Sequence, residues 1–352
     1  MATSRAAWAL LGLAGLAGLA GLAVLTAGYF GLQTQTHSHA RILAPEPSLL
    51  WRFSAEPSAS AAALRPLPKA IELDQRKVRL GERLFHDPRL SRDGSIACAS
   101  CHDIGIGGAD GLATSVGLGG ARSAVNAPTV LNSGFNAAQF WDGRASTLEE
   151  QVDGPLSHPD EMGTSWEEVL SKLRADPDYS RSFAEIYPAG IEPAYVRDAI
   201  AAYERSLITP SGPFDRYLRG KADAISERAR AGYALFASYG CISCHQGINL
   251  GGNLFEKFGV VVPRHKNIGF FKSADLGRYN VTGRDRDRFV FKVPSLRNAT
   301  LTAPYFHDGS AETLDEAIEQ MGLHQLGREL SDEEVALIAE FLATLTGEIP
   351  GG

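Results

Sequence analysis

The hydrophobic pattern of the chain changes after residue 32. Residues 6–32 carry no charge and consist mostly of Ala, Leu and Gly, a length that can cross a hydrocarbon core of about 30 Å as a helix. The apolar part of a secretory signal is usually about 7–15 residues, so an uncleaved anchor is favoured over a cleaved signal peptide for residues 1–32. A buried core helix fits poorly with a Gly-rich start behind a positive charge. Residues 33–66, rich in Ala, Pro and Ser, predict a flexible linker.

Beyond residue 66 the apolar positions follow a helical period, and strand signals are sparse. The β-like runs are residues 260–262 and 289–293. Ser331, followed by acidic residues, predicts the start of the last helix, and Gly347 predicts its end. The expected fold is therefore mainly α with long loops.

Two halves of this helical body repeat each other. Residues 81–85 resemble 232–236, residues 128–132 resemble 294–298, residues 140–150 resemble 306–316, and residues 200–207 resemble 338–345. The second and third of these pairs share an offset of 166 residues. Because such self-similarity indicates a duplicated structural unit, residues 67–215 and 216–352 are expected to form two related tandem domains.

The composition is that of an ordinary globular protein. Of the 352 residues, 44% are hydrophobic and 21% are charged, with a formal net charge of -7, which is neither a disordered nor a fibrous profile. No basic surplus is available for nucleic acid, so we expect no nucleic-acid partner. The four cysteines are too few for a disulfide-stapled scaffold, and they fall into two pairs.

Each cysteine pair belongs to a C-x-x-C-H motif. Cys98, Cys101 and His102 form the first motif, and Cys241, Cys244 and His245 form the second. This pattern is the signature of c-type haem attachment, in which two thiols bond one porphyrin and the histidine ligates its iron. A zinc site or a redox dithiol would use similar residues, but the wide separation of the pairs and the trailing histidines disfavour both. We expect two covalently bound haem c groups in two cytochrome c-like domains.

The halves differ where the offset of 166 aligns Met321 with Pro155. A methionine downstream of the haem motif is the sixth iron ligand of electron-transfer cytochromes c and raises the potential, whereas a proline cannot ligate iron. The chain has three methionines, one of them the initiator, so we assign Met321 with His245 to the second iron rather than to core packing. The first iron, on His102, is then expected to be open to water, peroxide or another small molecule.

Residues near this open position can perform acid–base chemistry. Glu161 and Gln151 lie in the segment expected to cover the first haem. A carboxylate there can take a proton from bound peroxide and return it to the distal oxygen, although a single Glu in a loop is more often only solvated. His158 and Met162 are the nearby residues that could close the position as a sixth ligand, and surface solvation is the better interpretation of His158.

These motifs resemble the bacterial di-haem cytochrome c peroxidase family, which includes the MauG-like enzymes that oxidise a partner protein. The resemblance spans about residues 68–347 and is carried by residues 80–91, 98–102, 126–132, 140–144, 161–162, 241–245, 293–298 and 305–309. It implies that the N-terminal haem is peroxidatic, that the His245/Met321 haem passes electrons, and that Trp141 lies between them. Packing alone is the alternative for Trp141, but its repeat partner is His307 and a packing position would more often keep an apolar pair.

The same resemblance assigns the remaining site residues. Glu161 would be the acid–base residue, with Gln151, Phe140 and Pro155 lining the distal side. A calcium ion between the domains would use the Asn126 side chain and the carbonyl groups of Thr302 and Pro304.

Two departures from the family pattern define the expected activity. Family peroxidases that need reductive activation carry a histidine in the loop after the first haem motif, where this chain has Leu118. The MauG-like branch has tyrosine where this chain has Met321. We therefore expect a periplasmic di-haem peroxidase whose first haem is open without reductive activation, and which reduces hydrogen peroxide to water with electrons from a small cytochrome c or cupredoxin.

Two alternatives stay open at this point. High-valent iron could oxidise Trp or Tyr on a partner protein, as in the MauG-like branch. A non-catalytic di-haem electron carrier would instead have His158 or Met162 on the first iron. Anchoring to the inner membrane by residues 1–32, and assembly into a homodimer, are further expectations that the sequence does not decide.

Overall fold

The computed structural model describes residues 64–264 and 272–350. The chain divides into two units, Met1–Ser54 and Ala55–Gly352, and every described residue belongs to the second. The predicted signal or anchor, and nearly all of the predicted linker, lie outside the described residues. No helix within the described ranges is long and apolar enough to span a bilayer.

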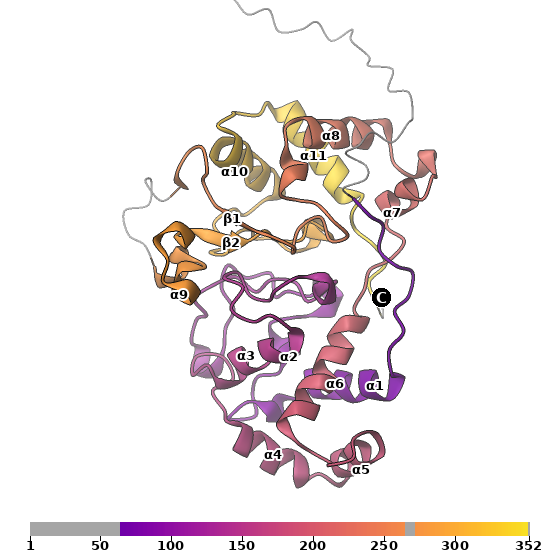
Figure 1. The fold of residues 1–352 in the computed structure, drawn as a ribbon, viewed down its shortest axis with the longest axis vertical. Helices are drawn as coiled ribbons and strands as arrows, with labels where there is room; N and C mark the ends of the chain where they lie inside the picture. The colour runs from indigo at the N-terminus through magenta and orange to yellow at the C-terminus, as the bar shows by residue number, and fades with distance from the viewer. Residues whose placement is uncertain (1–63, 265–271, 351–352) are drawn as a thin grey trace, which may run out of the picture. The chain divides into compact units, whose positions relative to one another are not determined.

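The described part of the chain is mainly helical, as predicted (Figure 1). Its first helices are α1 (Gln75–Phe85), α2 (Leu148–Gln151), α3 (Asp153–Ser157), α4 (Trp166–Arg174), α5 (Pro177–Ile186), α6 (Pro193–Ser206) and α7 (Pro213–Leu218). They are followed by α8 (Glu227–Ser238), α9 (Tyr279–Thr282), α10 (Leu314–Leu326) and α11 (Asp332–Ala343). Short 3-10 turns occupy many of the connections, including both cysteine motifs.

The strand and helix boundaries correct two predictions. The two short strands β1 (Phe255–Lys257) and β2 (Val290–Lys292) pair antiparallel, so the 289–293 run was correctly read. Residues 260–262 form no strand, because they lie in a turn after β1 with Val260 and Val261 exposed. Helix α11 begins at the predicted cap, where Ser331 and Glu334 form a capping box. It ends at Ala343 rather than at Gly347, whose lack of a side chain instead permits close approach to the Thr209 carbonyl.

Two crossed helix pairs form the framework of the described body. Helix α1 packs on α6, and α8 packs on α11 (Figure 1). A Cβ atom on Gly81 would lie 1.9 Å from the carbonyl oxygen of Ala199, and a Cβ atom on Gly232 would lie 1.9 Å from that of Leu337. Glycine therefore permits both helix crossings. Because Gly81 meets Ala199 of α6 and Gly232 meets Leu337 of α11, the crossings align α6 with α11 at an offset of 138 residues.

The loops repeat in backbone conformation as well as in sequence. Asn132 and Asn298 both have left-handed φ angles, 61° and 60°. Phe140 and Phe306 have φ angles of 67° and 70°, an uncommon conformation for residues other than glycine. These pairs keep the offset of 166 predicted from the sequence, so the repeat is a property of the backbone.

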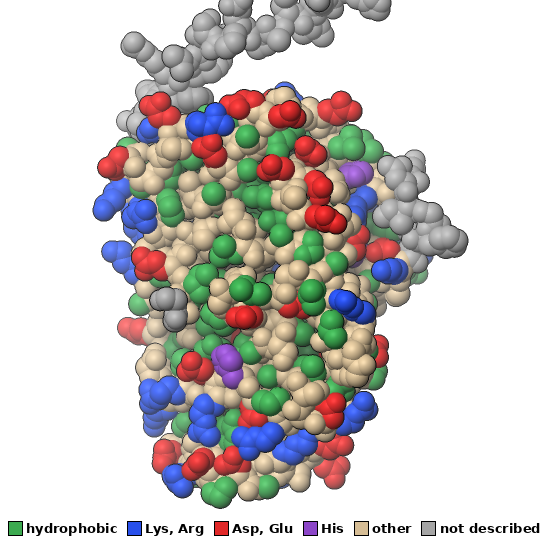
Figure 2. Space-filling view, turned by 180° about the vertical axis from the view of Figure 1, so that it is seen from behind, with side chains coloured by type: hydrophobic (Ala, Val, Ile, Leu, Met, Phe, Trp, Pro, Cys, Tyr) green, Lys and Arg blue, Asp and Glu red, His purple; other side chains and the backbone are tan. Residues whose placement is uncertain are grey.

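Each repeat contributes to its own hydrophobic cluster, and polar groups connect the two. The first cluster contains residues of α1, α4, α5 and α6, and the second contains residues of α7, α8 and α11 together with Leu64. Between them, the side chains of Asn132 and Asn298 both donate hydrogen bonds to Thr209 Oγ1, at 2.9 and 3.0 Å. The two left-handed asparagines therefore meet at one buried hydroxyl group. On the face shown in Figure 2, acidic and basic side chains are interspersed with apolar ones.

Candidate functional site

One cavity collects the residues predicted for the first haem. We call it the His102 cavity. Its lining includes Cys98, Cys101, His102, Asn126, Phe140, Gln151, Pro155, Glu161 and Met162. His158 is absent from the lining and is exposed, with its Nδ1 accepting a hydrogen bond from the Asp160 N–H at 3.3 Å.

The two motif histidines have the same hydrogen-bond arrangement. His102 Nδ1 lies 3.2 Å from the Gly108 carbonyl oxygen, and His245 Nδ1 lies 3.2 Å from the Leu250 carbonyl oxygen. A carbonyl can only accept, so Nδ1 carries the proton and Nε2 is left with a lone pair for a metal. Burial lowers the pKa of His102, and it lowers that of His245 to about 4. Both imidazoles are thus neutral at pH 7 and able to ligate iron.

The cysteine motifs do not form a cation site of the zinc type. Among the described residues, the one group of three or more His, Cys, Asp or Glu side chains with converging ligand atoms is Asp275, His307 and Asp308. His307 Nε2 lies 2.9 Å from Asp275 Oδ1, and Asp308 forms an ion pair with Arg264 at 3.0 Å. Each of these side chains therefore already has a protein partner in place of a metal ion. Among the described residues, the cysteines therefore do not converge on a shared metal ion.

The backbone around Glu161 is held from several directions. Its N–H donates to the His158 carbonyl at 3.1 Å, and its carbonyl accepts from the Leu118 N–H at 3.2 Å. The next residue, Met162, accepts from the Arg92 N–H at 2.9 Å. The Glu161 side chain is thereby fixed at the wall of the His102 cavity, where burial raises its pKa.

The loop with Leu118 packs directly on the Glu161 segment. Leu118 is buried, and a Cβ atom on Gly117 would lie 1.9 Å from the Asp160 carbonyl oxygen. A Cβ atom on Gly163 would lie 2.6 Å from Leu118 Cδ1. The loop therefore contacts the Glu161 segment at Asp160 and at Gly163, on either side of Glu161 in the sequence. These contacts hold the segment in place, and Leu118 gives the contact an apolar side chain.

Phe140 and Arg144 form the side of the cavity next to α3. The Arg144 guanidinium lies 3.4 Å from the centre of the Phe140 ring, and both residues line the cavity. The charge of Arg144 opposes the effect of burial on the pKa of Glu161. Sequence reasoning missed Arg144 as a site residue, although it is the last residue of the quoted segment 140–144.

Trp141 contacts both halves of the repeat. Its indole N–H donates to the Asn126 carbonyl at 2.9 Å, and its ring meets His307 edge to face at 6.4 Å between centroids. The Asn126 N–H donates to the His307 carbonyl at 2.8 Å, and the Lys292 N–H donates to the Trp141 carbonyl at 2.8 Å. Trp141 is therefore placed at the junction between the first-half loop and β2.

Asn126, Thr302 and Pro304 belong to loops that contact each other. The Asn126 side-chain N–H donates to the Leu112 carbonyl at 2.8 Å, which leaves Oδ1 as its acceptor group. Gly107, in the loop after the first cysteine motif, lies close to Thr302, since a Cβ atom on Gly107 would lie 3.4 Å from Thr302 Cγ2. Calcium binding by these groups stays a prediction.

Met321 lies within α10, where it is half-buried. One turn later in the same helix, His324 Nδ1 lies 2.8 Å from the Val262 carbonyl oxygen. This contact attaches the helix to the loop after β1. The repeat position in the first half, Pro155, lies in the five-residue helix α3, so the two halves differ in helix length as well as in side chain at this point.

Two buried charged residues were not identified from the sequence. Glu204 is 5% exposed and lines the His102 cavity, and burial raises its pKa to about 8. Lys292 is 7% exposed, and burial alone lowers its pKa to about 8. No side-chain hydrogen bond or ion pair of Lys292 occurs within residues 64–264 and 272–350. Comparison of the halves could have indicated both, since Leu342 is aligned with Glu204 and Asn126 with Lys292.

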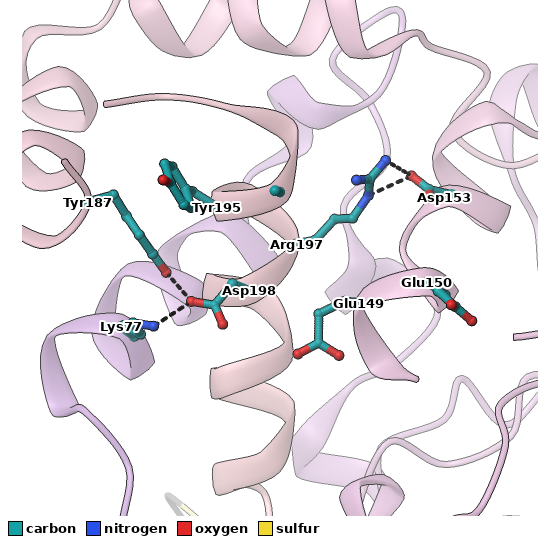
Figure 3. A pocket seen from close by; sticks show the side chains of 9 residues that line it. Lys77, Glu149, Glu150, Asp153, Tyr187, Tyr195, Arg197 and Asp198 are labelled. Carbon is teal, nitrogen blue, oxygen red and sulfur yellow. Dashed lines mark hydrogen bonds and ion pairs between the residues drawn. The ribbon is translucent and has the colours of Figure 1, made fainter. Parts of the chain in front are cut away.

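A second, open pocket lies on the outer side of α6 (Figure 3). Its charged groups are paired with one another: Asp198 accepts from Lys77 and from the Tyr187 hydroxyl group, both at 2.7 Å, and Arg197 pairs with Asp153 at 2.8 Å. Tyr187 stacks on Tyr195. No residue predicted from the sequence lines this pocket, and its groups serve to fix α6 against α1 and α3.

Comparison with known proteins supports the sequence-based assignment. Residues 75–223 match the family model described as di-haem cytochrome c peroxidase. The chain is 42% identical over 298 residues to a cytochrome c551 peroxidase of Nitrosomonas europaea, covering 84% of this chain and 88% of that protein. It is 41% identical to a cytochrome c551 peroxidase of Pseudomonas aeruginosa, covering 88% of this chain and 93% of that protein.

Two further similarities bear on the limits of this comparison. The match to cytochrome c peroxidase Ccp of Escherichia coli, at 48% identity, covers 81% of this chain but 61% of that protein. Among solved structures, the chain resembles a MauG-like protein associated with microbial copper homeostasis, with a TM-score of 0.71 and 32% identity over 80% of this chain and 95% of that one. These similarities and the geometry of the His102 cavity lead to one conclusion: the chain is an oxidoreductase and belongs to the di-haem cytochrome c peroxidase family.

Proposed function

We propose that the protein is a periplasmic di-haem peroxidase that reduces hydrogen peroxide to water with electrons from a small cytochrome c or cupredoxin. Residues 67–215 would form its peroxidatic domain and residues 216–352 its electron-transfer domain. The observation that carries the proposal is the convergence of His102, Glu161 and Gln151 on one cavity, at the place where the repeat substitutes Pro155 for Met321.

The residues fit two haem c groups. Both motif histidines are neutral and direct an unprotonated Nε2 away from their carbonyl partners. Within residues 64–264 and 272–350, no anion pairs with the buried ammonium group of Lys292, and a haem propionate would provide one. Haem c attached through Cys98 and Cys101 would supply an iron with an open coordination position and a store of redox equivalents.

Glu161 would carry the proton in peroxide reduction. The overall change is H₂O₂ plus two electrons and two protons to two water molecules. As a carboxylate, Glu161 accepts a proton from the oxygen nearer the His102 side, and as an acid it returns that proton to the distal oxygen while the O–O bond breaks. Burial raises the pKa of Glu161, which makes its acid form easier to regain than that of an ordinary carboxyl group. Gln151 can donate a hydrogen bond that orients the peroxide.

Trp141 would connect the two redox centres. It lies at the junction of the halves, in contact with His307 and with the loop that carries Asn126. His245 and Met321 would complete the second centre, which passes electrons from the donor towards the His102 cavity. Leu118, packed beside Glu161, has no atom able to ligate iron, so we propose that the enzyme needs no reductive activation.

Oxidation of Trp or Tyr on a partner protein is the second candidate. It is favoured by similarity to the methylamine utilization protein MauG of Methylorubrum extorquens, at 35% identity over 80% of this chain, and it is disfavoured by Met321.

The deciding experiment measures peroxide consumption by the holoprotein with reduced cytochrome c or reduced cupredoxin as sole donor. Turnover at enzymatic rates supports the peroxidase. Rapid reaction with peroxide but no donor turnover supports the second candidate, and no reaction with peroxide contradicts both.

A further inference from the structure

Glu204 is a buried acid in a position that the other half of the protein fills with a hydrocarbon. The crossings at Gly81 and Gly232 align Ala199 with Leu337 and Tyr203 with Phe341, so Glu204 in α6 is aligned with Leu342 in α11. Both side chains are similarly buried, at 5% and 4% exposure. The helix crossing therefore does not require a carboxyl group at this position.

One oxygen of the Glu204 carboxyl group lacks a hydrogen-bond partner in the described part of the chain. This oxygen is the buried Oε2 atom. The adjacent cation, Arg205, is engaged by Glu149 of α2 through two hydrogen bonds of 2.7 and 2.9 Å. A buried carboxyl oxygen without a partner costs stability, so its presence needs an explanation outside the apoprotein.

That explanation is found in the cavity that Glu204 lines. The same cavity holds Cys98, His102 and, on another wall, Glu161. The aligned Leu342 belongs to the other hydrophobic cluster. The acid is thus specific to the centre proposed to react with peroxide.

We propose that Glu204 is a redox-linked proton site of the His102 cavity: it releases a proton when the group bound there gains positive charge on oxidation and takes the proton back on reduction. At a pH between the Glu204 pKa values of the two redox states, each one-electron reduction is accompanied by uptake of a proton on one of the Glu204 oxygens, and each oxidation by its release to solvent. The inference rests on the proposed occupancy of the cavity by haem, but it does not depend on peroxide turnover.

The surrounding groups are consistent with this exchange. From α6 itself Glu204 faces Arg205, from α2 it faces Glu149, and from the first haem motif it faces Cys98, whose thiol becomes a thioether on haem attachment. Glu161 and Arg144 line the same cavity, and α1 contributes Glu82 beside the neighbouring Tyr203. Haem propionates would add further negative charge. Burial holds the pKa of Glu204 at about 8 in the absence of an added positive charge. An oxidised, positively charged group in the cavity would lower the pKa of Glu204. The proton exchange is therefore expected below about pH 8.

The sign of the effect on potential follows from this linkage. Below both pKa values Glu204 is protonated in either redox state, and the potential does not depend on this residue. As pH rises, the carboxylate stabilises the oxidised state and the potential falls. Glu204→Gln keeps the size of the side chain and remains neutral at every pH. The potential of the first haem in this variant should therefore equal that of the parent at acid pH and be higher than that of the parent at alkaline pH.

The test is a spectroelectrochemical titration of both haems in the holoprotein between pH 5 and 9, for the parent, Glu204→Gln and Glu204→Leu. For the first haem of the parent we expect the ferrous-to-ferric ratio at fixed potential to fall by up to tenfold per pH unit, about 59 mV for one electron, over part of this range. Both variants should lose this dependence. The second haem is the internal control, because Leu342 occupies the aligned position, and its titration should not change between proteins.

Thermal unfolding of the same proteins separates a structural role from the proposed one. We expect both variants to unfold at the parent temperature or above, because a buried carboxyl oxygen without a partner is removed. Parent-like pH dependence in Glu204→Gln would overturn the inference. Equal changes in both haems, or loss of stability with an unaltered titration, would also overturn it. Peroxide turnover of the parent, measured in parallel, reports on the proposed function independently.

Discussion

Replacing Glu161 by Gln removes a proton acceptor from the His102 cavity while the shape of the side chain is kept. The backbone bonds from Leu118 to the Glu161 carbonyl and from the Glu161 N–H to His158 do not involve the side chain. The variant should therefore fold and attach haem as the parent does. A positioned acid–base group contributes about 10²–10⁴-fold to rate, so kcat/KM for peroxide should fall by that factor. At about 1.36 kcal/mol per decade this is roughly 3–5 kcal/mol of transition-state stabilisation.

The assay follows oxidation of a reduced donor cytochrome after addition of peroxide, across pH. Burial raises the pKa of Glu161 above its ordinary value, so the carboxylate needed to accept a proton is present above that raised pKa and is lost as pH falls through it. The parent rate should show this acidic limb and Glu161→Gln should not. Glu167→Gln, an exposed change in the first turn of α4, is the matched control and should leave the rate unaltered. A parent rate for Glu161→Gln, or an unchanged acidic limb, would refute the reasoning.

Three other changes test the remaining parts of the account. Met321→Ala should abolish the far-red absorption band of an iron–thioether bond in the oxidised protein, and a band that survives would remove Met321 from the ligand set. Trp141→Phe should slow electron transfer between the haems in pulse-reduction experiments while both haem spectra stay as in the parent; an unchanged rate would reduce Trp141 to a packing residue. Gly232→Ala places a Cβ atom 1.9 Å from the Leu337 carbonyl, and should lower the free energy of unfolding by roughly 1–3 kcal/mol, as measured by thermal denaturation; parent stability would contradict the close crossing of α8 and α11.

The repeat explains why so much of the helical framework could be read from the sequence. The motifs around Gly81 and Gly232 identify the crossing helices, and the offset of 166 correctly aligned Asn132 with Asn298, which share left-handed backbone conformations and one hydrogen-bond partner. Residues 260–262 were misread as a strand, because three consecutive valines have high β propensity while strand formation depends on a partner. The partner of β2 turned out to be Phe255–Lys257.

The site residues that belong to sequence motifs could be predicted. The residues that only the fold brings to the cavity could not. Cys98, His102 and Glu161 stand in recognisable segments, and the structure brings them to one cavity. Arg144 and Glu204 reach that cavity from a loop and from the far end of α6. Arg144 ends the recognisable segment 140–144, but only the fold places it at the cavity. The repeat aligns Glu204 with Leu342, but only the fold shows that this acid is buried at the cavity wall.

The proposed function depends on a difference between the two haems at the sixth ligand, with Pro155 in one half and Met321 in the other. The most direct measurement is the combined optical and electron paramagnetic resonance spectrum of the fully oxidised holoprotein, recorded before and after addition of one equivalent of peroxide. We expect one high-spin haem, with water or no sixth ligand, and one low-spin His/Met haem. The high-spin signal should be lost on addition of peroxide. Two low-spin haems that do not react with peroxide would contradict it.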